Sequence, residues 1–197
     1  MPVQLESIGS CSGRPLFQSV RTLAVVWWAV LVVGSAVVCT SPAAGAEPPG
    51  TSQERPFISE QPVDGYFPLD SKAAPADVYV DPEDWKVVQI AARDLTADVE
   101  RVTGCKPALK GAVGALSAQA VLVGTIGRSP VIDRLIKEGR LDVRGVQGEW
   151  ESFVIVGVSD PVPGVRQGLV IAGSDRRGTA YGVYELSRRI GVSPWYW

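Results

Sequence analysis

Carboxylates and tyrosines are the side chains left for acid–base chemistry in this sequence, because its 197 residues include no histidine. That absence excludes Ser-His-Asp and Cys-His nucleophile systems, histidine-bearing metal sites and the HExxH helix. Glu149 and Glu151 stand two positions apart and would share a face if the segment is extended. Paired carboxylates are what glycoside hydrolysis uses, but a polar loop that enters a strand explains this pair as well. We favour the loop, and we expect no catalytic residue in this chain.

Two other segments have residue types suited to binding. In Asp175-Arg176-Arg177 the arginines could bind a sugar carboxylate, but a capped helix start with solvated charges is the simpler interpretation. The segment 124–129 (GTIGRS) superficially resembles a phosphate loop. It lacks the Lys-Ser/Thr ending of a P-loop and the glycine spacing of a dinucleotide site, so we interpret it as a tight connection. We therefore expect no cofactor and no metal site.

The first 46 residues have the pattern of a secretory signal peptide. Arg14 and Arg21 precede an apolar run over 23–38, and the small residues 44–46 (AGA) form a cleavage pattern. The run is shorter than the roughly 20 residues that a membrane span needs, so we expect no stable membrane span. We predict cleavage near Ala46 and a secreted or periplasmic protein. The alternatives are an uncleaved anchor and a lipoprotein attached through Cys39.

Cleavage at that point fixes the charge and the cysteine content of the mature chain. It leaves 17 basic and 20 acidic side chains, and this balance argues against a nucleic-acid partner. Cys105 would be the one cysteine left. We therefore expect no internal disulfide and interpret Cys105 as a small packing residue rather than a reactive thiol.

The rest of the chain alternates between strand and helix patterns. Residues 47–76 form a flexible N-terminal arm with at most a short strand, and an α/β domain follows over 77–197. Apolar runs predict strands at 77–80, 120–124, 153–156 and 169–172, with a brief edge strand at 106–109. Predicted helices begin at Asp81-Pro82, Ser129-Pro130 and Ser174 or Asp175, and end at Gly104, Gly139 and Gly191.

This order predicts an α/β (α+β) fold, a mixed β-sheet with helices packed against it. The strands at 153–156 and 169–172 should be antiparallel neighbours, because the connection between them is short. The sequence then ends on Trp195, Tyr196 and Trp197. Three large aromatic side chains at a free terminus would expose a large apolar surface, so we expect a following domain against which they pack. Stacking on a sugar ring is the alternative.

The last 25 residues carry a family resemblance. Residues 173–187 (GSDRRGTAYGVYELS) and 190–197 (IGVSPWYW) are similar to the N-terminal region of glycoside hydrolase family 115, the xylan α-1,2-glucuronidases. The segments 121–125 (VLVGT) and 149–153 (EWESF) fit the same region. The resemblance covers roughly residues 77–197, and its terminal motif is the specific part.

The resemblance implies an accessory domain like those that precede the (β/α)₈ barrel in α-glucuronidases and β-hexosaminidases. In the family the barrel holds the catalytic carboxylates and most of the pocket for (4-O-methyl)glucuronic acid, and the reaction inverts the anomeric centre. The sequence stops before a barrel, so we expect the catalytic domain beyond Trp197 and glucuronoxylan as the substrate of the full-length enzyme. The alternative is a free-standing carbohydrate-binding or interaction module without hydrolase activity. Arg176, Arg177, Trp195, Tyr196 and Trp197 are the substrate-binding candidates.

Overall fold

The fold is that of a computed structural model, which describes residues 3–4, 58–59, 66–71 and 75–192. The chain divides into two compact units, and the smaller of them, residues 12–54, lies wholly outside the described residues. The larger unit contains all the helices and strands given below.

The centre of this unit is a five-stranded mixed sheet. Its strand order is β5-β4-β6-β8-β7. Strands β5, β4, β6 and β8 run parallel to their neighbours, and β7 at the edge is antiparallel to β8. In spatial order the strands are β5 (Leu109–Lys110), β4 (Asp77–Val80), β6 (Gln119–Thr125), β8 (Val165–Gly173) and β7 (Phe153–Val162).

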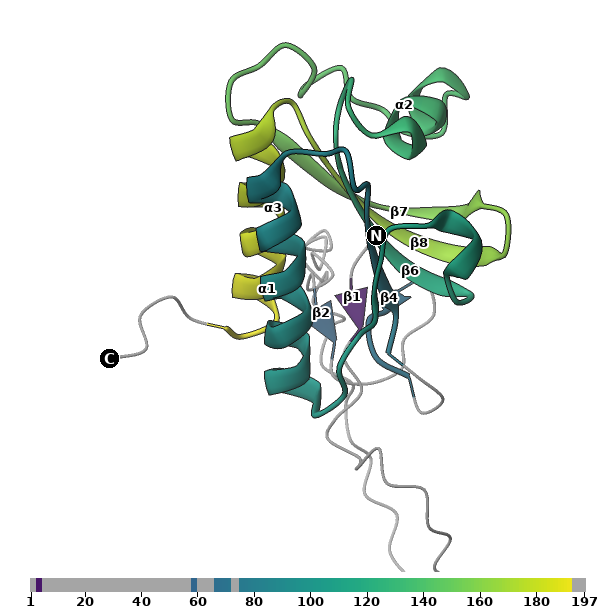
Figure 1. Cartoon of the computed structure of the whole chain (residues 1–197), viewed down its shortest axis with the longest axis vertical. Coiled ribbons are helices and arrows are strands. Elements are labelled where there is room, and N and C mark those ends of the chain that lie inside the picture. Colours follow the sequence, from purple (N-terminus) through teal and green to yellow (C-terminus); the bar gives the residue numbers. More distant parts are fainter. Residues whose placement is uncertain (1–2, 5–57, 60–65, 72–74, 193–197) are drawn as a thin grey trace, which may run out of the picture. The chain divides into compact units, whose positions relative to one another are not determined.

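Helices cover both faces of the sheet. Helices α1 (Lys86–Thr103) and α3 (Arg176–Arg189) lie side by side on one face, and α2 (Pro130–Lys137) lies on the other (Figure 1). Each face has its own apolar cluster, one built on α1 and α3 and the other on α2. A short 3₁₀ turn, η1 (Val113–Ala115), precedes β6. The predicted fold class is confirmed: this is an α/β fold with a mixed sheet between helices.

Most of the predicted elements lie where the sequence places them. The two central strands β6 and β8 are buried over nearly their whole length, as their continuous apolar runs predict. Strands β7 and β8 form the expected antiparallel pair, but they are longer than predicted, and the turn between them is only Pro163-Gly164. The predicted edge strand is the two-residue β5, shifted toward Lys110 because Pro107 lacks the N–H that a sheet needs.

The start of α1 differs from the prediction. We expected Asp81 and Pro82 to open the helix, but it begins at Lys86. The Asp81 carboxylate instead accepts a hydrogen bond from the Glu83 backbone N–H at 2.8 Å and closes a turn. The next acidic residue, Asp84, is buried and accepts a hydrogen bond at 2.7 Å from the N–H of Trp85, and no side chain caps α1.

A second, small sheet precedes the main one in sequence. Its order is β2-β1-β3, formed by β2 (Ile58–Ser59), β1 (Val3–Gln4) and β3 (Phe67–Pro68). Phe67 and Leu69 are fully buried in the cluster under α1 and α3, so part of the segment that we assigned to an arm contributes to the core. The boundaries predicted for the signal peptide, the arm and the domain stay predictions.

Cys105, just after the end of α1, is disulfide-bonded. The expectation of an unbridged packing residue is wrong for the uncleaved chain. The two other cysteines, Cys11 and Cys39, lie outside the described residues and inside the segment that signal cleavage would remove.

One buried polar network joins the three elements that meet at the carboxyl ends of the strands. Asp84 accepts hydrogen bonds from the Thr125 backbone N–H at 2.8 Å and from the Thr125 hydroxyl at 2.9 Å. The Thr125 hydroxyl also lies 2.9 Å from that of Thr179 on α3. All three side chains are buried. The network therefore ties the entry of α1, the end of β6 and the first turn of α3 to one point.

Replacing Asp84 tests this network. Asp84→Ala leaves the buried Thr125 N–H and hydroxyl without their acceptor, so we expect a loss of roughly 2–4 kcal/mol in the free energy of unfolding. Asp84→Asn keeps one acceptor oxygen and should lose less. Urea unfolding followed by circular dichroism measures both. Glu83→Ala, at the exposed neighbouring position, is the matched control. Equal stability of Asp84→Ala and this control would show that the network contributes nothing.

Candidate functional site

The carboxyl edge of the sheet contains the point where the chain changes direction across it. From β4 the chain leaves through α1 to β5 on one side, whereas from β6 it leaves through α2 and β7 to β8 on the other side. The crevice outside such a switch point is where open α/β sheets bind ligands. The loops after β4 and β6 supply Trp85 and Arg128 here, and the first turn of α3 brings Arg176 and Arg177 to the same edge.

The start of α3 is fixed by Asp175. Its carboxylate accepts hydrogen bonds from the backbone N–H groups of Arg177 at 2.8 Å and Gly178 at 2.7 Å, so Asp175 rather than Ser174 is the N-cap of the two that the sequence allows. It also accepts one at 3.0 Å from the N–H of Glu151, which precedes β7. Burial alone would raise the pKa of Asp175, but these backbone donors hold the pKa below its ordinary value.

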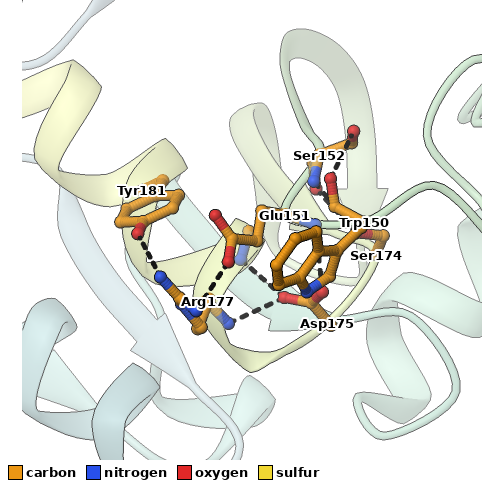
Figure 2. Close-up of polar contacts among 8 residues, drawn as sticks. Trp150, Glu151, Ser152, Ser174, Asp175, Arg177 and Tyr181 are labelled. Atoms are coloured by element: carbon orange, nitrogen blue, oxygen red, sulfur yellow. Dashed lines mark hydrogen bonds and ion pairs between the residues drawn. The ribbon is translucent and has the colours of Figure 1, made fainter.

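Arg177 is held by its neighbours. Its guanidinium forms an ion pair with Glu151 at 2.7 Å and donates a hydrogen bond to the Tyr181 hydroxyl at 3.0 Å (Figure 2). It also lies over the rings of Trp150 and Tyr181, 5.8 Å from each centroid. The Tyr181 hydrogen bond and the Glu151 charge raise the pKa of Arg177. Arg177 therefore joins α3 to the chain that enters β7.

Glu149 and Glu151 would share a face only in an extended segment. The segment is not extended, since residues 144–151 run through turns and Glu151 has a positive φ of 53°. The Glu151 side chain pairs with Arg177, while Glu149 is exposed. The segment is therefore a turn-rich loop that enters β7, the interpretation that we favour from the sequence.

Arg176 projects to the other side of α3, toward Trp85. Its guanidinium carbon lies 5.9 Å from the centroid of that ring, and that of Arg128 lies 4.0 Å from it. Neither arginine forms an ion pair with any residue that the structure describes. We call Trp85, Arg128 and Arg176 the switch-point cluster. It places two cations, neither of them ion-paired within the described part of the chain, against one indole that remains 39% exposed.

The loop between β6 and α2 uses its own N–H groups internally. The Ile126 N–H bonds the carbonyl of Gly173, the Gly127 N–H bonds the Asp133 carboxylate, and those of Arg128 and Ser129 bond the carbonyl of Thr125. No row of N–H donors is left to surround a phosphate. This is in keeping with the interpretation of a tight connection, and it leaves the Arg128 side chain as the loop's contribution to the site.

The glycines of the segment that carries the family resemblance are packing positions. A Cβ at Gly173 would lie 2.1 Å from the Thr179 backbone nitrogen, and one at Gly178 would lie 2.4 Å from the Ser152 carbonyl oxygen. A Cβ at Gly182 would meet the side chain of Ile171 at 2.8 Å. These glycines let α3 lie directly on β7 and β8, so the motif is explained largely by helix–sheet packing.

The remaining predicted features are placed as follows. Trp195, Tyr196 and Trp197 lie outside the described residues. Among the residues that the structure describes, no three His, Cys, Asp or Glu side chains are grouped as a metal site would require. Within the same residues, none of the helices combines the length and the apolar character of a membrane-crossing segment. Arg176 and Arg177 alone among the substrate-binding candidates can therefore be located.

Sequence reasoning missed Trp85, Arg128 and Trp150 as members of this edge. Trp150 is 79% exposed beside Arg177. One signal was available. Each of these three residues lies just before or just after a strand or helix and does not fit the apolar pattern of that element. That signal is weak, because the stacking on Arg128 and Arg177 depends on contacts between loops far apart in sequence.

Comparison with known proteins shows a similarity to a solved structure. No protein-family model and no curated protein matches the chain. Among solved structures, it is similar to BtGH115A, a family GH115 4-O-methyl-α-glucuronidase with specificity for decorated arabinogalactans. The two share 31% sequence identity with a TM-score of 0.50, over 63% of this chain. The chain spans 14% of the length of that protein. The chain therefore has a GH115-like fold.

Gly178→Ala tests the packing role of the motif. The added Cβ must push against the Ser152 backbone carbonyl, so we expect a loss of roughly 2 kcal/mol or more in unfolding free energy, although alanine favours helix. Gly145→Ala is the matched control, because a Cβ there meets nothing within 4 Å. Thermal unfolding of both variants checks this. A Gly178→Ala protein as stable as the control would remove the packing explanation.

Asp175→Asn tests the cap and its charge. The folded-state pKa of Asp175 is depressed from 3.8, so the carboxylate stabilises the fold above that pH and loses its effect as pH falls through the folded value. We expect the variant to be about 0.5–1.5 kcal/mol less stable at neutral pH, with the difference shrinking below about pH 4. Denaturant titrations at several pH values measure it. A deficit that does not change with pH would contradict the charge effect.

Proposed function

We propose that this chain is the non-catalytic leading domain of a secreted GH115-type α-glucuronidase. The observation that carries the proposal is the 31% identity to BtGH115A over 63% of the chain, on a shared fold. The full-length enzyme would remove (4-O-methyl)glucuronic acid side chains from glucuronoxylan, with its catalytic barrel C-terminal to Trp197. The apolar run and small residues over 23–46 would direct its export.

The chemistry of the described edge supports a non-catalytic role. An inverting glycosidase needs one carboxylic acid and one carboxylate about 6.5–9.5 Å apart, with room for a water between them. Here Asp84 is buried on Thr125, Asp175 caps α3, and Glu151 pairs with Arg177. Each of these carboxylates has a structural partner, so none is placed to exchange a proton with a glycosidic oxygen.

The proposal is tested by comparing this chain with the longer product of its reading frame. We expect the gene to continue beyond the codon for Trp197 into a barrel domain. Residues 1–197 should release no 4-O-methylglucuronic acid from glucuronoxylan or from decorated arabinogalactan, and the extended protein should release it from at least one of them. Chromatography of the released acidic sugar is the measurement.

Three results would count against this assignment. A stop codon after Trp197 with no barrel sequence in any downstream frame would favour a free-standing module. Release of the acidic sugar by residues 1–197 alone would show that the chain is catalytic. An extended protein that is active only on substrates without a uronic acid would place it in another class of glycosidase.

A further inference from the structure

We propose that the switch-point cluster, Trp85 with Arg128 and Arg176, binds the carboxylate of a uronic acid residue in a polysaccharide. This site lies on the accessory domain itself and would give the chain an affinity for acidic polysaccharide without any catalytic step. The class of ligand rests on the proposed function, whereas the existence of an anion site rests on the arrangement of the cluster.

The switch-point cluster carries positive charge that no ion pair within the described residues balances. Other arginines near this edge or on α3 have acidic partners, as Arg177 has Glu151 and Arg188 has Glu185. Arg128 and Arg176 have no ion pair with a described residue, yet both approach the same ring. The two guanidinium carbons lie 4.0 and 5.9 Å from the same ring centroid, so an anion bound beside that ring would be attracted by both charges. The cluster is therefore better suited to an anion than to solvent alone.

The side chains of the cluster match the chemistry of a carboxylated sugar. A guanidinium presents a planar pair of donors that matches a carboxylate. The indole of Trp85 remains 39% exposed beside these donors, so the part of its apolar surface that the two guanidinium groups leave open can contact a sugar ring. The adjoining loop has no N–H row for a phosphate, as described above. BtGH115A, the similar protein, is a 4-O-methyl-α-glucuronidase, so a uronic acid is the anion that this context supplies.

The acidic side chains in the loop before Trp85 leave the charge of the cluster largely unopposed. The carboxylate of Asp84 is buried on Thr125, and that of Asp81 accepts hydrogen bonds from Glu83 N–H and the Tyr79 hydroxyl. Glu83 is exposed and forms no ion pair with a described residue. It is the one neighbour in this loop that competes with a bound anion. The chain as a whole carries a net charge of −2, so general attraction does not explain binding of a polyanion.

Binding of defined oligosaccharides by the purified chain tests the site. Calorimetry would compare 4-O-methylglucuronoxylan oligosaccharides with the same oligosaccharides after reduction of their carboxyl groups to alcohols. We expect binding of the acidic form, weakening as salt is raised, and at least tenfold weaker binding of the reduced form. Equal binding of both forms, or binding of neither, would overturn the proposal.

Paired variants assign the binding to the cluster. Arg128→Gln with Arg176→Gln should weaken binding of the acidic oligosaccharide at least about tenfold. Arg101→Gln with Arg144→Gln removes the same charge from two exposed arginines that already pair with Asp98 and Asp142, and it should bind as the unmodified chain does. Glu83→Gln should bind more tightly. Thermal unfolding of each variant shows that the fold is intact.

Two further outcomes complete the test. Equal weakening by the cluster variant and by its charge-matched control would show non-specific attraction and would overturn the site. Poly-glutamate that binds as tightly as the oligosaccharide would point to an acidic polypeptide instead, and would overturn the uronic acid. Neither outcome bears on uronic acid release by the extended protein, so the site and the proposed function can fail separately.

Discussion

The buried carboxylate of Asp84 is the constraint on which the carboxyl edge of this fold depends. It holds the backbone and the hydroxyl of Thr125 at the end of β6, and Thr125 in turn meets Thr179 in α3. A buried charge is tolerated only when hydrogen bonds replace its lost hydration. The same network therefore ties the segment that enters α1 and the first turn of α3 to the end of β6. Because Trp85 follows Asp84 directly, it also fixes where the indole of the switch-point cluster emerges.

The segment 173–187 has mainly a packing explanation. Gly173, Gly178 and Gly182 allow α3 to approach the sheet more closely than any larger residue would permit. Asp175 caps the helix and reaches across to Glu151. Close backbone contacts allow only certain residue types at these positions. Such a stretch of sequence can therefore identify a fold even where none of its residues contacts a ligand. The similarity to BtGH115A is consistent with this, since it concerns the fold of a small part of that protein.

Two adjacent arginines have different roles because successive residues of a helix point about 100° apart. Arg177 turns toward Glu151, Tyr181 and Trp150 and is engaged in structure. Arg176 turns toward Trp85, where Arg128 already lies. The protein itself supplies the negative charge that pairs with Arg177. Arg176 lies in a cluster without an acidic side chain, and this difference separates a structural contact from a candidate binding group.

Local patterns were sufficient for the order of the five strands of the main sheet and its three helices. Apolar runs predicted β6 and β8, and side-chain chemistry within three residues narrowed the cap of α3 to Ser174 or Asp175, because helix capping and strand burial depend on neighbours in sequence. The same local rule misplaced the start of α1. Asp84 is engaged by Thr125, 41 positions away, and no pattern near Asp84 reveals that partner.

The sequence by itself determined the α/β class, the strand and helix order and the absence of histidine chemistry, since these follow from composition and from short-range periodicity. Only the tertiary structure decided which charged groups are engaged. Glu151 forms an ion pair with Arg177 instead of sharing an extended face with Glu149. Arg128 and Arg176 approach Trp85 from separate segments of the chain. Contacts of this kind depend on how the sheet brings distant loops to one edge, which is a property of the packed chain and not of any segment.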